Sequence, residues 1–217
     1  METVASRIYS SIKEQIIDGR YAPGARITEQ NIAAEFKSSR TPVREAMRQL
    51  VADGFALFKP NSGTVVRHWT PEQMRQIFDL RALIESEIAS HAAQRVRRSD
   101  VDALAKLQDE IEAHGVDLGP DNTARIGRLN REFHNRVARA SQNERLVSML
   151  VAAIEVPIVQ QTFRRYSAAQ LARSFGHHRE LIEAFRANDD AWAKCVMGSH
   201  IHSAKQTLIG AKSHASH

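Results

Sequence analysis

The feature that most constrains the fold is a pair of short apolar runs, Phe55–Phe58 and Thr64–Val66, on either side of a turn at residues 60–63. Two such runs around an Asn and Gly turn predict a β-hairpin. Three segments with helical start or stop signals precede it, at residues 3–18, 28–36 and 41–53. This order of three helices and a hairpin predicts a winged helix-turn-helix over residues 1–69.

The third of these helical segments has the clearest boundaries. Thr41 is followed by Pro42, the pattern of an N-cap residue and a proline at the first helical position. Gly54 marks the C-terminal stop. We therefore expect the helix to begin directly after Thr41 and to run to Asp53.

The rest of the chain carries no strand signal. The run Thr70-Pro71-Glu72-Gln73 resembles a capping box with proline at the first helical position, and predicts a helix to about residue 96. Further helices are expected at 99–114, 121–141, 144–165, 168–187 and 189–211, with a kink at Pro157. The predicted fold class is mainly α, in which an all-α six-helix antiparallel bundle at 70–212 follows the winged domain. Residues 213–217 are expected to form a disordered tail.

Composition predicts a globular chain in the cytoplasm. The hydrophobic share is 42% and the charged share 25%, which disfavours disorder. No apolar run approaches the roughly 20 residues of a membrane span, and residues 1–20 lack the apolar core of a secretory signal. Cys195 is the one cysteine, so neither an internal disulfide nor a thiolate cluster is expected.

The third predicted helix gathers positive charge. Residues 1–69 hold ten Lys and Arg against seven Asp and Glu, and residues 37–48 form a local basic cluster. Such a cluster is typical of phosphate binding, although a solvated helix face would have the same composition.

One side of this helix is expected to face DNA. At 100° per residue the apolar residues Val43, Met47 and Leu50 share one side, whereas Arg44 and Arg48 lie on another. An arginine fork can bridge guanine O6 and N7 or bind a phosphate. The alternative is that Arg44 pairs with an acid of its own domain. In the predicted wing, residues able to approach the DNA are Lys59, Asn61 and Gly63.

Two stretches, Asp18–Glu29 and Ser39–Ala46, resemble the N-terminal domain of GntR-superfamily regulators. The second stretch, Ser-Arg-Thr-Pro-Val-Arg-Glu-Ala, is long and specific. The resemblance implies that Arg40 and Arg44 contact double-stranded operator DNA, that Ser39 and Thr41 assist, and that Gly63 lets the hairpin approach. Two departures, Gln30 where the family often has arginine and Lys37-Ser38 in place of Gly-Val, predict a shifted operator preference.

Nine of the ten histidines lie beyond residue 90, and three of them fall on predicted inward faces of three helices. These are His134, His178 and His200. Each alone is more simply a hydrogen-bonded core histidine. Three unsatisfied imidazoles in one core would be costly, however, and one divalent metal would satisfy all three. Asn130, one turn before His134, could add an oxygen ligand.

This half of the chain resembles the FCD domain of the FadR branch, in its six-helix VanR-like form. Asn130–His134, His178–Phe185 and His200 match the family's metal-binding elements, with Asn130 in place of the more usual aspartate. The resemblance implies a divalent metal, commonly zinc or nickel, that helps to bind a small organic acid effector. Arg81 matches a position that often faces the effector, and the equal alternative is an ion pair with Glu85.

The predicted function is therefore a ligand-responsive bacterial transcription regulator, a repressor by family resemblance. One recognition helix reads too few base pairs, so a homodimer on an inverted repeat is expected. The alternatives are a DNA-binding dimer with a purely structural bundle, and a metal-dependent enzyme. We expect no enzyme, because the sequence has no nucleophile elbow, phosphate loop or His-Glu-x-x-His motif.

Overall fold

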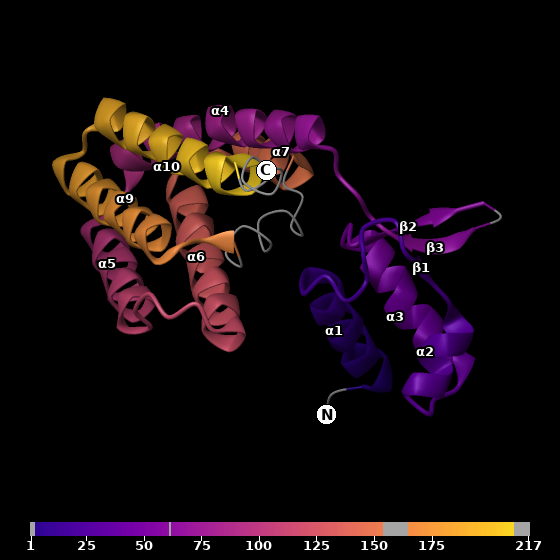
Figure 1. The fold of residues 1–217 in the computed structure, drawn as a ribbon. Coiled ribbons are helices and arrows are strands. Elements are labelled where there is room, and N and C mark those ends of the chain that lie inside the picture. The colour runs from indigo at the N-terminus through magenta and orange to yellow at the C-terminus, as the bar shows by residue number, and fades with distance from the viewer. Residues whose placement is uncertain (1–2, 61, 154–164, 211–217) are drawn as a thin grey trace, which may run out of the picture. The chain divides into compact units, whose positions relative to one another are not determined.

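The computed structural model describes residues 3–60, 62–153 and 165–210 of the 217-residue chain. The chain divides into two compact units, and the boundary falls between Thr70 and Pro71. Both units are labelled by element in Figure 1. Among the described helices, none is long and apolar enough to cross a membrane.

The first unit is the predicted winged helix-turn-helix. Its elements are α1 (Val4–Ile17), β1 (Arg26–Ile27), α2 (Glu29–Glu35), α3 (Arg40–Ala52), β2 (Ala56–Lys59) and β3 (Gly63–Val66). The predicted hairpin is present, but β1 adds a third antiparallel strand, so that the order is β1-β3-β2. Because β1 has only two residues, it is too short to produce the alternating pattern by which strands are recognised.

The core of this unit follows from the spacing of apolar residues along α1 and α3. Ile8, Ile12 and Ile16 recur every four residues on α1 and are all buried. They belong to one cluster with residues of the other elements: Ile27, Ile32, Val43, Ala46, Met47, Leu50, Phe55 and Val66. This packing fixes α3 by one side and leaves its opposite side in solvent.

The predicted N-cap of α3 at Thr41, with the helix beginning at Pro42, is wrong by two residues. The N-cap is Ser39, whose backbone is extended, and the helix begins at Arg40. Pro42 is therefore the third helical residue. The first four amides of a helix have no partner within it, so proline is tolerated throughout the first turn and does not specify its first residue. Thr28, the first residue of the segment predicted at 28–36, caps α2, and its side chain accepts a hydrogen bond from the backbone amide of Asn31.

The second unit is the predicted helical bundle. Its described helices are α4 (Pro71–Arg95), α5 (Arg98–Ala113), α6 (Pro120–Ala140), α7 (Glu144–Ala153), α9 (Ala168–Ala187) and α10 (Asp190–Gly210). The helix expected at 144–165 is described only to Ala153. Its second half, which includes the predicted kink at Pro157, lies outside the described residues. The predicted tail at 213–217 does so as well.

Helix α10 runs beside α4 and packs against α9 (Figure 1). A small residue permits the close approach of α10 to α4, because a Cβ atom added to Gly198 would lie 3.2 Å from Oγ of Ser86. Helix α4 also packs on α6, and α5 packs on both α6 and α9. As a result, α4, α5, α6, α9 and α10 all contribute side chains to one interior.

Candidate metal centre and nucleic-acid interface

Three helices of the second unit each bring one imidazole to the same point. His134 comes from α6, His178 from α9 and His200 from α10. One potential ligand atom of each lies within 4.8 Å of those of the other two. Nε2 of His134 and Nε2 of His200 are 3.2 Å apart. The inward direction that helical periodicity predicts for the three side chains is therefore the observed one.

This spacing suits a single ion. Two nitrogen ligands of a tetrahedral zinc ion, each bound at about 2.0–2.1 Å, lie about 3.3 Å from one another. The two Nε2 atoms at 3.2 Å nearly have this separation already. Two lone pairs at such a distance repel one another unless a proton or a cation lies between them.

Burial keeps two of the rings in the form that binds metal. It lowers the pKa of His178 well below the ordinary value of 6.5, and the nearby His134 and His177 lower it further. The pKa of His200 is lowered in the same way, first by burial and then by its neighbours His178 and His134. Both imidazoles are thus neutral at neutral pH, and a neutral imidazole is the metal ligand.

His134 is held by a buried carboxylate. Its Nδ1 atom lies 2.8 Å from Oε2 of Glu85, and Oε1 of Glu85 accepts from Nε of Arg81, also at 2.8 Å. Burial alone would raise the pKa of Glu85. Arg81 and His134 reverse this effect and lower the pKa to about 2. The carboxylate is therefore ionised and can only accept, so Nδ1 of His134 carries the proton and Nε2 is directed at the cluster.

The ion pair of Arg81 with Glu85 is the alternative that the sequence left open for Arg81. Both side chains are buried, and the guanidinium also lies over the ring of Phe78 at 5.0 Å. The bond to Glu85 uses only Nε of Arg81. Ion pairing with Glu85 and contact of the two Nη groups with another anion are thus compatible.

Several buried polar atoms on α6, α9 and α10 have no hydrogen-bond partner within the described part of the chain. They include Oδ1 of Asn130, Nε2 of His178 and Nδ1 of His200. An unsatisfied buried polar atom costs about 1–3 kcal/mol, so such a cluster needs an explanation. A divalent cation fits Oδ1 of Asn130 and the Nε2 atoms, because amide oxygen and imidazole nitrogen are both common ligands.

Sequence reasoning missed several residues that surround the histidines. His177 precedes His178 on α9; its ring centroid lies 5.8 Å from that of His200, and its Nδ1 atom is buried. Tyr166 is also buried, and burial raises the pKa of its phenol to about 12, against opposing effects of Ser174 and Arg81. Phe133, adjacent to His134, stacks on His178 with a centroid distance of 4.1 Å.

In the first unit, the side of α3 that faces away from the core is polar. The predicted DNA-contacting residues of this helix and its N-cap are all exposed: Ser39, Arg40, Thr41, Arg44 and Arg48. Nε of Arg44 donates a hydrogen bond to a carboxylate oxygen of Glu29 at 2.9 Å. This is the pairing with an acid of its own domain that the sequence left open for Arg44. Both side chains are largely exposed, and such pairs contribute only about 0–1 kcal/mol, so a phosphate or base can displace Glu29.

The wing presents two further cations. Lys59 is exposed at the end of β2 and pairs in register with Gly63, whose φ of 74° is accessible mainly to glycine. Arg26 of β1, which sequence reasoning did not select, lies beside Gly63. Its Nε and Nη2 atoms are 3.9 Å from the position that a Cβ atom on residue 63 would take. Asn61, the third predicted wing residue, lies outside the described residues.

A winged helix-turn-helix followed by an all-helical domain defines a class of bacterial transcription regulators, and comparison with known families agrees. The family described as "Bacterial regulatory proteins, gntR family" matches residues 4–66, and the FCD domain matches residues 76–203. The chain belongs to the GntR family of regulators with an FCD domain, the architecture of the FadR subfamily.

Similar proteins with known names are transcription regulators. The chain is 30% identical to the Bacillus subtilis regulator YdhC over 66% of the chain and 63% of that protein. It is 28% identical to a probable D-xylose utilization operon repressor of Paenarthrobacter nicotinovorans, over 92% of the chain and 86% of the relative. The Exu regulon regulator of Escherichia coli is 27% identical over 94% of the chain and 83% of the relative.

Solved structures share the fold. Escherichia coli McbR/YncC superimposes with a TM-score of 0.69 at 22% identity, over 93% of this chain and 95% of that one. A GntR regulator from Rhodococcus sp. RHA1 has a TM-score of 0.66 at 24% identity, over 95% and 98% of the two chains.

Proposed function

We propose that this chain is a ligand-responsive repressor whose FCD domain binds a divalent metal and a small organic acid. The observation that carries the proposal is the histidine cluster, whose three potential ligand atoms lie within 4.8 Å of one another. One turn before His134 on α6, the buried Oδ1 of Asn130 has no hydrogen-bond partner among the described residues. The name of the Paenarthrobacter relative as a probable repressor supports the sign of regulation.

The metal would be held by Asn130, His134, His178 and His200, with zinc or nickel as the preferred ions. Three imidazoles and one amide oxygen suit either ion and leave room for an external ligand. When bound, the metal would supply a Lewis acid that attracts the carboxylate of the effector. Because all four protein ligands are neutral, the bound ion would keep its full positive charge, which favours an anionic effector.

The effector would meet Arg81 beside the metal. The Nη groups of Arg81 are not engaged by Glu85, and a guanidinium can bind a carboxylate through two parallel hydrogen bonds. Tyr166 lies close enough to Arg81 for the guanidinium to affect its pKa, and its phenol is neutral at physiological pH.

DNA binding would use the exposed side of α3 and the wing. Arg40 and Arg44 would contact the operator, with Ser39, Thr41 and Arg48 assisting and with Lys59, Asn61 and Gly63 in the wing. The second helix of such a motif enters the major groove by its N-terminal part, which is where Arg40 and Arg44 lie on α3. The partner is double-stranded DNA with an inverted repeat.

A homodimer would bring together the DNA-binding domains of two chains. Support comes from apolar side chains exposed on α4 and α7, which pack against one another: Leu83 is 69% exposed, Met149 54% and Val151 71%. Large exposed apolar residues on neighbouring helices favour burial against a second copy.

The test combines three measurements on the purified full chain. Metal content is measured before and after treatment with a chelator, and thermal stability is measured against a library of carboxylic acids with and without zinc. Release of the protein from a duplex selected out of random DNA is then measured with each acid that stabilises it. We expect at least one acid to stabilise the chain only with zinc and to release the DNA. If chelation changes neither stability nor DNA release, the bundle is purely structural.

A further inference from the structure

Gln108 of α5 connects the histidine cluster to a surface ion pair. Its side chain is fully buried. The amide nitrogen Nε2 donates to Oε1 of Glu112 at 2.9 Å, and the amide oxygen Oε1 lies 2.8 Å from Nδ1 of His178. Gln108 and Glu112 are one helical turn apart, so the same helix face carries both.

The orientation of this amide is determined by its partner. An ionised carboxylate can only accept hydrogen bonds, so the amide NH₂ must face Glu112 and the carbonyl oxygen must face His178. Glu112 is ionised at neutral pH, because the hydrogen bond from Arg179 holds its pKa below the ordinary value of 4.5 against the effect of burial.

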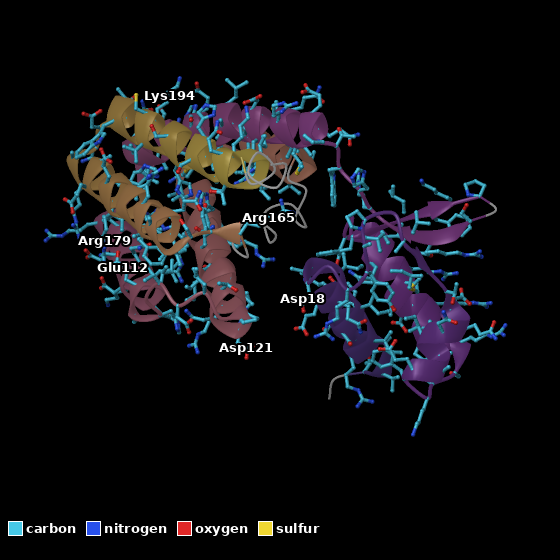
Figure 2. The ribbon with its side chains drawn as sticks, viewed as in Figure 1. Asp18, Glu112, Asp121, Arg165, Arg179 and Lys194 are labelled. Atoms are coloured by element: carbon cyan, nitrogen blue, oxygen red, sulfur yellow. The ribbon has the colours of Figure 1, made fainter. Side chains whose placement is uncertain are left out.

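Arg179 holds Glu112 in place through two bonds. Its Nε donates to Oε1 and its Nη2 to Oε2 of Glu112, both at 2.8 Å, and Nη2 also donates to Asp109 at 2.6 Å. Figure 2 labels Arg179 and Glu112 where α9 lies against α5. Arg179 directly follows His178 in α9, so this ion pair and the histidine share one short segment of backbone.

The orientation of the amide determines which nitrogen of His178 carries the proton. A carbonyl oxygen accepts, so Nδ1 of His178 must donate, and a neutral ring then has its lone pair on Nε2. That Nε2 atom is buried and has no hydrogen-bond partner among the described residues. We infer that Gln108, oriented by Glu112 and Arg179, is a positioning residue that makes Nε2 of His178 a metal ligand. This inference rests on the proposed metal site.

The three histidines differ in the hydrogen-bond partner of their Nδ1 atoms. His134 bonds to the carboxylate of Glu85, which can only accept when ionised, so its proton stays on Nδ1. Nδ1 of His200 has no hydrogen-bond partner in residues 3–60, 62–153 and 165–210. The support of His178 is a neutral amide, which could rotate if Glu112 were lost. A rotated amide would present NH₂ to Nδ1, move the ring proton to Nε2 and remove the lone pair that a metal needs. Metal binding is thereby sensitive to the ion pair between α5 and α9.

The test measures the tautomer of His178 and the affinity for zinc on the full chain. Nitrogen chemical shifts of ¹⁵N-histidine-labelled, metal-free protein give the tautomer, with the His178→Ala variant for assignment. A competition titration with a chromophoric chelator gives the zinc affinity. The first variant is Gln108→Met, whose side chain has a similar volume but cannot form the hydrogen bonds to Glu112 and His178. The second is Glu112→Ala, which removes the partly exposed carboxylate that orients Gln108.

We expect the wild type to hold the Nδ1–H tautomer. Gln108→Met should show a mixture of tautomers and lose about 10- to 100-fold in zinc affinity, as is typical when the partner of a metal-binding histidine is removed. Glu112→Ala should lose affinity in the same direction by a smaller factor. The control Gln94→Met also removes a bond between helices, that to Asp190, and should match the wild type in both measurements.

An Nε2–H tautomer of His178 in the wild type would overturn the inference, as would unchanged zinc affinity in a folded Gln108→Met variant. In the second case the wild type would still bind zinc, so the proposed function would stand. A wild type that binds no zinc would contradict the proposed function before any variant is made. If Gln108→Met fails to fold, Glu112→Ala decides, and wild-type affinity and tautomer in that variant would overturn the inference.

Discussion

Nδ1 of His134 lies 2.8 Å from a carboxylate oxygen of Glu85, and both side chains are largely buried. The other carboxylate oxygen accepts from Arg81, so one buried anion joins a cation to a candidate metal ligand. A carboxylate behind a histidine fixes the ring and raises its basicity as a ligand. The bonds of Glu85 account for the burial of two charged residues on α4.

Glu85→Ala should destabilise the chain strongly, because it leaves Arg81 buried without its partner. Breaking a buried pair in this way costs about 3–5 kcal/mol. The free energy of unfolding is measured by urea denaturation in the presence of a chelator, so that metal does not contribute. The control is Glu87→Ala on the same helix, whose exposed pair with Lys194 should contribute no more than about 1 kcal/mol. Equal losses in the two variants would contradict the structural role of Glu85.

Arg179→Gln should lower thermal stability at neutral pH and lose that effect in acid. The pKa of Glu112 is lower in the folded chain than its ordinary value of 4.5, mainly through the hydrogen bond from Arg179. A group with a depressed folded pKa stabilises the fold above its unfolded pKa, and this stability disappears as the pH falls through the folded value.

Melting temperatures of the wild type and Arg179→Gln are therefore compared from pH 7 downwards. We expect the difference between them to shrink below pH 4.5. Arg186→Gln, which removes an exposed pair with Glu183 on the same helix, serves as the control and should show a smaller difference throughout. A difference of constant size at every pH would rule out the pair as its source.

Arg44→Ala should abolish binding to the selected operator duplex and leave binding of zinc and of the effector intact. Its guanidinium is exposed on α3, and the bond that it would exchange for DNA is a surface bond to Glu29. Fluorescence anisotropy with labelled duplex measures the affinity. Arg125→Ala, an exposed arginine of the second unit, is the control. Operator binding by Arg44→Ala at wild-type affinity would show that α3 is not the recognition helix.

Gln30→Arg should tighten DNA binding, because it adds a cation at the position where the family resemblance leads us to expect arginine. Gln30 is exposed on α2, so the substitution should not disturb the core. One added phosphate contact should steepen the dependence of log affinity on log salt concentration by about one unit. The affinity is measured from 50 to 300 mM salt with selected and unrelated duplexes. An unchanged slope would mean that residue 30 does not reach a phosphate in this protein.

Much of the fold could be predicted because it depends on local patterns. The spacing of Ile8, Ile12 and Ile16 predicts the inward side of α1, and the hairpin follows from two apolar runs around a turn. The same periodicity predicts that His134, His178 and His200 point inward. Periodicity does not predict which residue of a neighbouring helix a side chain will bond to, because this depends on how the two helices pack against one another.

Gln108 and Glu85 illustrate the difference. Gln108 lies on the apolar side of α5 between Leu104 and Ile111, so a polar residue in a buried row was visible in the sequence. Its bond to His178, 70 residues away, was not. Glu85 was considered only as a partner of Arg81, and its second bond to His134 required the packing of α4 on α6.

The most direct test of the account is a zinc titration of the metal-free full chain by calorimetry. We expect one ion per chain, and we expect His178→Ala to lose this binding while its affinity for the operator duplex is unchanged. His202→Ala changes an exposed histidine two residues beyond His200, on the opposite side of α10, and should bind zinc as the wild type does. A wild-type chain that takes up no zinc, or an equal uptake by His178→Ala, would contradict a metal centre built on these histidines.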